Sequence, residues 1–282
     1  MRSEKEVISQ LLRYAELDAR VKVVLLNGSR VNPKVSKDIL CDYDVIFGVM
    51  DTNSFVENQE WISKFGELII MQHNTIQEDA EDWPIFLMLF TDGVRVDLSI
   101  RKTEQIIEPA DSLTKVLLDK ENLMGIIEPA SDRSYVTNKP SKEQYDEALN
   151  EIWWCSTNVA KGLWRGELPY AKYMLDVVVR DAVVTLLSWY IGMNNGWNIN
   201  TGKAGRWLER FLPGDVWTAF AKTYVGGDPE HNWNALLETG ELVRTVGKAV
   251  ADGLGCDYPQ AEDTKVTEYI IQLRKGSARE NG

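Results

Sequence analysis

The sequence predicts an α+β protein in two parts. The N-terminal domain, residues 1–128, should hold a mixed sheet flanked by helices, and residues 129–282 should form an all-helical domain. Short apolar runs of strand length, separated by turn residues, occur before about residue 125. Beyond that point the chain carries helix-start signals and eight of its ten Trp residues. The polar segment bracketed by Pro129 and Pro140 is the expected linker.

The N-terminal domain is expected to begin with a helix and to contain a hairpin. Ser3 and Glu6 have the spacing of a capping box, and an apolar stripe of helical period follows them. Asp92-Gly93 separates two apolar runs and predicts a two-residue type I′ hairpin loop. The expected strands are residues 21–26, 42–50, 67–71, 85–91, 94–100 and 115–118, and a second helix is expected over 51–65.

The second domain shows only helical signals. Ser141 and Gln144 form another capping box, which predicts a helix to about residue 162. Asp228-Pro229 has the pattern of an N-cap followed by proline at the first helical position. The further helices expected are residues 169–193, 203–211, 215–224 and 229–253.

Composition limits the possible functions. The chain has a formal charge of −12, which argues against a protein that coats nucleic acid but suits a small cationic partner. The longest apolar run, Ile85–Phe90, is too short to cross a membrane, and the first residues lack the apolar core of a signal peptide. Three scattered Cys give no disulfide framework, and two distant His suggest no zinc site. We therefore expect a cytoplasmic protein.

Gly28-Ser29 follows the first expected strand directly. Glycine permits a tight turn and a close approach of a ligand to the backbone. Successive N–H groups in such a turn can bind phosphate oxygens, and the Ser29 hydroxyl adds a donor. Many Gly-Ser pairs are simple turns, so this pair alone does not establish a phosphate site.

Asp42 and Asp44 lie on the next expected strand. Alternation places both carboxylates on one face, with Tyr43 and Val45 on the other. Such a pair is costly on a central strand because the charges repel and lose water. Mg²⁺ offsets that cost, since it prefers carboxylate oxygens together with substrate phosphates. The alternative is a pair of surface aspartates on an edge strand.

Asp97 belongs to the second arm of the hairpin. Its strand alternates, with Arg95, Asp97 and Ser99 on one face and apolar residues on the other. If this strand lies beside that of Asp42, a third carboxylate joins the group. Taken singly, Asp97 is more typical of a solvated strand position than of a catalytic one.

Together these residues resemble the nucleotidyltransferase superfamily of DNA polymerase β: Gly-Ser, twelve residues, Asp-x-Asp, and a distant Asp in an apolar strand. The chain further resembles the aminoglycoside 6-adenylyltransferases, also called streptomycin adenylyltransferases, over nearly its whole length. The segments that carry this resemblance are residues 26–30, 42–44, 95–98, 115–120 and 159–163. Asn27 departs from the pattern, in which an acidic residue is expected before Gly-Ser.

The resemblance implies a polymerase β-like N-terminal fold, ATP as the nucleotide donor and AMP transfer to a hydroxyl of streptomycin. By this resemblance Asp42 and Asp44 hold Mg²⁺ on the triphosphate, and Asp97 is the expected general base and a ligand of a second Mg²⁺. Gly28 and Ser29 are expected to cradle the outer phosphates, with Arg30 as a helper.

Four residues of the helical domain are further candidates. Glu147 and Glu151 lie one helical turn apart and are rival general bases or substrate ligands, unless they form a solvated acidic face. Lys161 is the basic candidate for the triphosphate, with a surface lysine as the alternative. Trp154 shares its face and is a candidate for stacking on the cationic acceptor.

The sequence leaves two other functions open. Another acceptor, such as a different aminoglycoside, a lincosamide or a protein, would use the same three aspartates, because these residues act on ATP. A non-catalytic nucleotide-binding module is the other, and retention of all three carboxylates argues against it.

Overall fold

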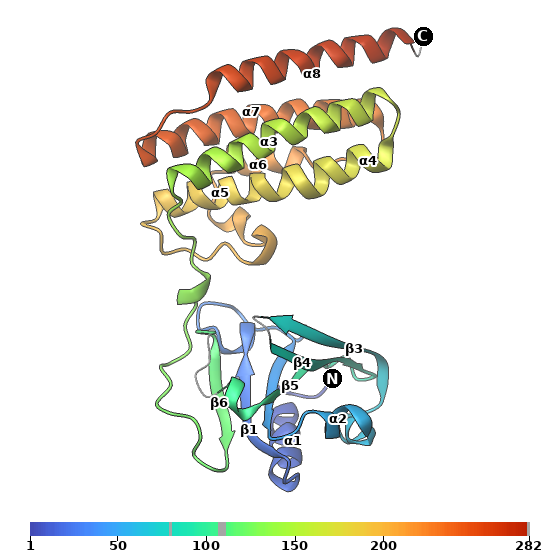
Figure 1. The fold of residues 1–282 in the computed structure, drawn as a ribbon, viewed down its shortest axis with the longest axis vertical. Helices are drawn as coiled ribbons and strands as arrows, with labels where there is room; N and C mark the ends of the chain where they lie inside the picture. The colour runs from blue at the N-terminus through green and yellow to red at the C-terminus, as the bar shows by residue number, and fades with distance from the viewer. Residues whose placement is uncertain (79–80, 107–110, 281–282) are drawn as a thin grey trace. The chain divides into compact units, whose positions relative to one another are not determined.

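The computed structural model describes residues 1–78, 81–106 and 111–280. They belong to two units, Met1–Ser134 and Tyr135–Gly282. The predicted linker begins in the first unit, which extends through residues 129–134. The predicted fold class is confirmed: a mixed sheet with helices comes first and helices alone follow (Figure 1).

Within the described residues of the first unit, six strands form one sheet in the order β3-β4-β5-β2-β1-β6. The strands are β1 Val21–Asn27, β2 Tyr43–Val49, β3 Leu68–Glu78, β4 Glu81–Phe90, β5 Arg95–Lys102 and β6 Thr114–Asp119. β2 and β5 are parallel, and the other neighbouring strands are antiparallel. The two strands expected to carry aspartates are therefore adjacent at the centre of the sheet.

The main core covers one face of this sheet. Helix α1, Glu4–Leu17, starts at the predicted capping box of Ser3 and Glu6 and buries Val7, Leu11 and Ala15 against the strands. Among the described residues, the opposite face carries a smaller apolar cluster of Val23, Leu25, Ile46, Ile106 and Met124. Because side chains alternate along a strand, Asp44 shares this second face with Ile46.

Three predictions in the first unit were wrong in detail. The expected helix 51–65 is a short α2, Asn53–Glu57, followed by a 3₁₀ turn, Glu60–Phe65. β3 extends well beyond residue 71, because its ladder with β4 continues through polar positions. The hairpin loop has three residues, since Phe90 N–H bonds to the carbonyl of Val94, and Gly93 adopts a left-handed conformation (φ +82°).

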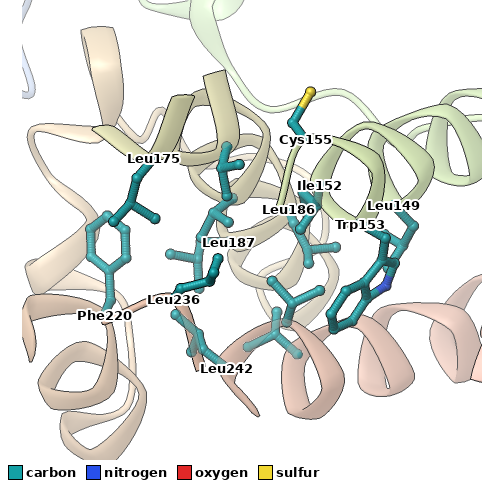
Figure 2. Packing of buried hydrophobic residues seen from close by; sticks show 14 of the residues in the cluster. Leu149, Ile152, Trp153, Cys155, Leu175, Leu186, Leu187, Phe220, Leu236 and Leu242 are labelled. Atoms are coloured by element: carbon teal, nitrogen blue, oxygen red, sulfur yellow. The ribbon is translucent and has the colours of Figure 1, made fainter. Parts of the chain in front are cut away.

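The second unit is helical. Its helices are α3 Lys142–Trp164, α4 Leu168–Tyr173, α5 Arg180–Asn194, α6 Gly214–Lys222, α7 Pro229–Leu254 and α8 Gln260–Glu280. A π-helical turn, Met174–Val179, joins α4 to α5. The predicted caps are confirmed at Ser141, whose hydroxyl accepts from Gln144 N–H, and at Asp228, which accepts from His231 N–H. Figure 2 shows side chains from α3, α5, α6 and α7 meeting in one apolar core.

Two predictions failed in this unit. Residues 203–211 form two 3₁₀ turns instead of a helix, and Gly202, Ala204 and Gly205 have positive φ angles that interrupt helical hydrogen bonding. Helix α8 has no counterpart among the predicted helices. Nε and Nη2 of Arg244 on α7 donate to the two oxygens of the buried Asp263 carboxylate, at 2.7 and 2.5 Å. This pair anchors α8. No helix in the described part of the chain is long and apolar enough to cross a membrane.

Candidate active site

The parallel pairing of β2 and β5 brings the predicted aspartates together. Asp44 lies directly opposite Asp97 in the ladder, and Asp42 precedes β2 by one residue. The apolar residues of both strands, including Tyr43, Val45 and Leu98, point into the main core. Packing on that side therefore holds the carboxylates on the other face, where the apolar cluster is small.

Gly28 makes room for one of these carboxylates. It follows β1 with a φ of +72°, and a Cβ built there would lie 2.2 Å from Oδ2 of Asp44. Any larger residue would displace the carboxylate. The N–H of Gly28 donates to the carbonyl of Leu113, so the glycine contributes space for Asp44 rather than the expected phosphate donor. Ser29 is half-buried, and its hydroxyl has no partner among the described residues.

The crowding of negative charge changes the acidity of the group. Burial, together with the charges of Asp97 and Asp42, raises the pKa of Asp44 to about 6. Burial also raises the pKa of Asp42, an effect that the charge of Arg95 opposes. The folded chain therefore carries an electrostatic cost at Asp44 at neutral pH, which a bound cation would relieve.

Arg95 already offsets part of this charge. Its Nε and Nη2 donate to the two carboxylate oxygens of Asp97, each at 2.8 Å. Its Nη1 lies 3.7 Å from Oδ2 of Asp42. The guanidinium thus contacts two of the three aspartates, one of them through a planar fork.

Arg30 has a different place from the one predicted. Its side chain is only 5% exposed and stacks on the ring of Tyr43 at 3.5 Å. Its guanidinium donates to the backbone carbonyls of Asp42 and Cys41 and to the carboxylate of Glu4, at 3.0, 2.6 and 3.0 Å. Through these bonds Arg30 holds the backbone that precedes Asp44, and its expected phosphate contact stays a prediction.

The carboxylates suit a magnesium ion bound together with phosphates. Their oxygens are hard donors, and Mg²⁺ is often held by one or two carboxylates, with water and substrate phosphates completing the shell. As the side chains stand, no three His, Cys, Asp or Glu in residues 1–78, 81–106 and 111–280 converge into a metal site. Asp42 and Asp44 fit a two-carboxylate site, whereas the fork from Arg95 engages both oxygens of Asp97.

A cavity of about 770 Å³ lies in the helical unit. Its wall includes two of the predicted substrate residues, Glu147 and Glu151, on one face of α3. The π-helical turn and α5 supply the rest of the charged and aromatic lining, Asp176, Arg180, Asp181 and Trp189, and Tyr224 completes it. Asp176 pairs with Lys172 and Arg180. Glu147, Glu151 and Asp181 have no cationic partner within the described residues, so the wall is acidic.

The other two candidates in this unit do not line the cavity. Trp154 is 66% exposed on α3 and points away from the core. Lys161, farther along the same helix, is half-buried, and its amino group has no hydrogen-bond or ion-pair partner among the described residues. Its amino group therefore remains open to a ligand, and its assignment to the triphosphate stays a prediction.

Comparison with known proteins decides the family. The model of the family described as streptomycin adenylyltransferase matches residues 1–273. This chain belongs to the streptomycin adenylyltransferase family. Proteins named aminoglycoside 6-adenylyltransferase from Campylobacter jejuni and Bacillus subtilis are 35% and 34% identical to it, over 98% and 96% of this chain and 97% and 98% of theirs. A solved structure titled aminoglycoside 6-adenyltransferase from Bacillus subtilis is 30% identical, covers 97% of this chain and 99% of that one, and has a TM-score of 0.49.

Membership of the streptomycin adenylyltransferase family makes this chain a nucleotidyltransferase. Asn27, the departure from the expected acidic residue, lies opposite Asp44 in the β1–β2 ladder. A carboxylate there would add a like charge beside a group whose pKa is already raised to about 6. The neutral amide spares the site that further repulsion.

Sequence reasoning missed three residues near these sites. The charge of Asp111 contributes to the raised pKa of Asp44, and no pattern connects the two positions. Arg95 could have been suspected, because it shares the polar face of its strand with Asp97. Asp181 lies five residues after Asp176, a spacing that an α-helix does not align but that the π-helical turn brings to one wall.

We predict that Asp44→Asn stabilises the metal-free protein at neutral and higher pH. Asp44 has a pKa of about 6 when folded, against an ordinary 3.8, so the fold favours its protonated form. The contribution of protonated Asp44 to the free energy of unfolding is fully present below about pH 4 and is lost as pH rises through about 6. Calorimetry in EDTA should find the variant more stable by up to about 3 kcal/mol above pH 7, with the difference vanishing below pH 4.

The exposed Glu57, which lies on the short helix α2 of the same unit, provides the control for this measurement. Glu57→Gln should leave the free energy of unfolding within about 0.5 kcal/mol of the wild type. If Asp44→Asn gave no gain above pH 7, or a gain that did not change with pH, charge crowding at Asp44 would be excluded.

Proposed function

We propose that this chain transfers AMP from ATP to a hydroxyl of streptomycin, with Mg²⁺ as cofactor, and thereby inactivates the antibiotic. The observation that carries the proposal is Asp44 opposite Asp97 on paired parallel strands, in a chain of the streptomycin adenylyltransferase family. The relatives named aminoglycoside 6-adenylyltransferase support the class of acceptor.

The reaction is a displacement at the α-phosphorus of ATP. The acceptor oxygen forms a bond to this phosphorus, and the bond from phosphorus to the oxygen that bridges the β-phosphate breaks, so pyrophosphate leaves. Mg²⁺ held by Asp42 and Asp44 would neutralise charge on the triphosphate. Asp97 takes the proton of the attacking hydroxyl. The free hydroxyl of Ser29 donates to a phosphate oxygen, and Lys161 remains a candidate for a second contact.

The acidic cavity of the helical unit is the proposed acceptor site. Streptomycin carries guanidinium groups, and the cavity wall holds the carboxylates of Glu147, Glu151 and Asp181, which pair with no cation in the part of the chain that the structure describes. Guanidinium–carboxylate pairs form charge-assisted, two-point hydrogen bonds. Trp189 adds an aromatic face on which a guanidinium or a sugar ring can stack.

Mass spectrometry of antibiotics incubated with MgATP tests the proposal. Streptomycin should gain the mass of one AMP, with release of pyrophosphate, and few other aminoglycosides in a panel should do so. Modification of a different aminoglycoside, a lincosamide or a protein would keep the reaction and replace the acceptor. Magnesium-dependent ATP binding without any transfer would instead identify a nucleotide-binding module.

We predict that Asp97→Asn lowers kcat about 10²–10⁴-fold, because a general base acts in the chemical step. The amide keeps the shape of the side chain and cannot take the proton. Steady-state kinetics should show this loss, and equilibrium binding of MgATP should change much less. A collapse of ATP affinity with normal residual kcat would make Asp97 a metal ligand and no base, and Glu151 would be tested next.

We also predict that Glu147→Gln and Glu151→Gln each raise the KM for streptomycin about fivefold and leave the KM for ATP unchanged. Each substitution removes one negative charge from the cavity wall, and a partly solvated ion pair is worth about 1 kcal/mol. Glu238→Gln is the matched control, because Glu238 is exposed on α7 and lies outside the cavity lining. Equal KM values in all three variants would contradict the assignment of this cavity to the acceptor.

A further inference from the structure

Arg95 is a cationic residue at the aspartate site to which the proposed chemistry gives no task. It is the first residue of β5, two positions before Asp97 on the same face of the strand. Its side chain is 45% exposed, whereas that of Asp97 is 14% exposed. The guanidinium therefore covers the carboxylate from the solvent side.

The contacts of Arg95 match those that a divalent cation would make. It reaches both oxygens of Asp97 and comes within 3.7 Å of an oxygen of Asp42. Arg30 is the other arginine whose charge acts on Asp42, but its donors are taken by two backbone carbonyls and Glu4. Of these two arginines, Arg95 is thus the one whose guanidinium faces the carboxylates themselves.

The guanidinium of Arg95 and a metal ion held by Asp42 and Asp44 would compete at Asp42, which lies 3.7 Å from Nη1 of Arg95. Two positive groups within a few ångströms repel strongly where water is partly excluded. While the fork is formed, both oxygens of Asp97 accept charge-assisted hydrogen bonds from Arg95, and the guanidinium stands between the carboxylate and an incoming hydroxyl. A catalytic state with Asp97 as base therefore requires Arg95 to leave.

The released guanidinium has an obvious new partner. A triphosphate brings several anionic oxygens to the site, and the planar fork of arginine fits phosphate as well as it fits carboxylate. Arginine also has the long, flexible stem needed to exchange one partner for the other, and half of this side chain is already in solvent.

We propose that Arg95 is an exchangeable counter-ion: it pairs with Asp97 and Asp42 in the nucleotide-free protein, and moves to the phosphate oxygens when MgATP binds. The inference rests on the proposed use of ATP but not on the acceptor. It makes Arg95 a positioning residue that keeps Asp97 paired until the nucleotide has arrived.

Two substitutions and two binding measurements test the exchange. Arg95→Met removes the charge and keeps much of the stem, and Arg95→Lys keeps the charge and loses the fork. Electron paramagnetic resonance with Mn²⁺ alone measures metal affinity of the nucleotide-free protein. Titration with MgATP measures nucleotide affinity. Lys5→Met, at an exposed position of α1 in the same unit, is the control for loss of one positive charge.

Arg95→Met should bind Mn²⁺ at least about fivefold more tightly than the wild type, because the competing cation is gone. It should bind MgATP about tenfold more weakly, since a charge-assisted phosphate contact is lost. Arg95→Lys should retain near-wild-type Mn²⁺ affinity and regain only part of the MgATP affinity. Circular dichroism verifies that each variant is folded.

In Arg95→Met the affinities for Mn²⁺ and for MgATP should change in opposite directions, and this distinguishes the exchange from a merely structural role. If Arg95 only held Asp97 in place, its loss would weaken Mn²⁺ binding, and this result would overturn the inference. Unchanged MgATP affinity in Arg95→Met would overturn it as well. Failure of the proposed acceptor is distinguishable, because it would appear as absent transfer to streptomycin by the wild type, whatever the binding data show.

Discussion

Repulsion between the carboxylates of Asp44 and Asp97 is the interaction on which the active site depends. The parallel ladder of β2 and β5 aligns the two residues, so the backbone itself imposes their proximity. Burial and neighbouring charge then raise the pKa of Asp44 to about 6. This repulsion lowers the stability of the ligand-free protein. A ligand that neutralises the charge removes the repulsion, and the free energy released contributes to its binding.

The surrounding structure keeps the repelling groups in place. Apolar side chains anchor both strands from the opposite face, and Arg30 ties the segment before β2 through backbone carbonyls. Gly28 leaves the space that Asp44 occupies. Arg95 places a positive charge beside Asp97 and Asp42. Each of these features acts on the position or the charge of the carboxylates.

Local patterns predicted the aspartates but not their environment. Alternation placed Asp42 and Asp44 on one face correctly, and apolar runs located β1, β2 and β5 within a few residues. Alternation cannot say which strand is the neighbour, so the pairing of Asp44 with Asp97 needed the structure. Helix α8 was missed because its sequence is polar and its place depends on a long-range ion pair, Arg244 with Asp263. Trp154 lies on the predicted helix, but its exposed face is turned from the cavity.

A crystal of the protein grown with Mn²⁺ and a non-hydrolysable ATP analogue tests the central claim most directly. Anomalous scattering locates the metal without reference to activity. We predict a peak about 2.2 Å from carboxylate oxygens of both Asp42 and Asp44 and bound also by phosphate oxygens of the nucleotide. A metal held by the phosphates alone, with both aspartates outside coordination distance, would contradict the role given to the paired strands.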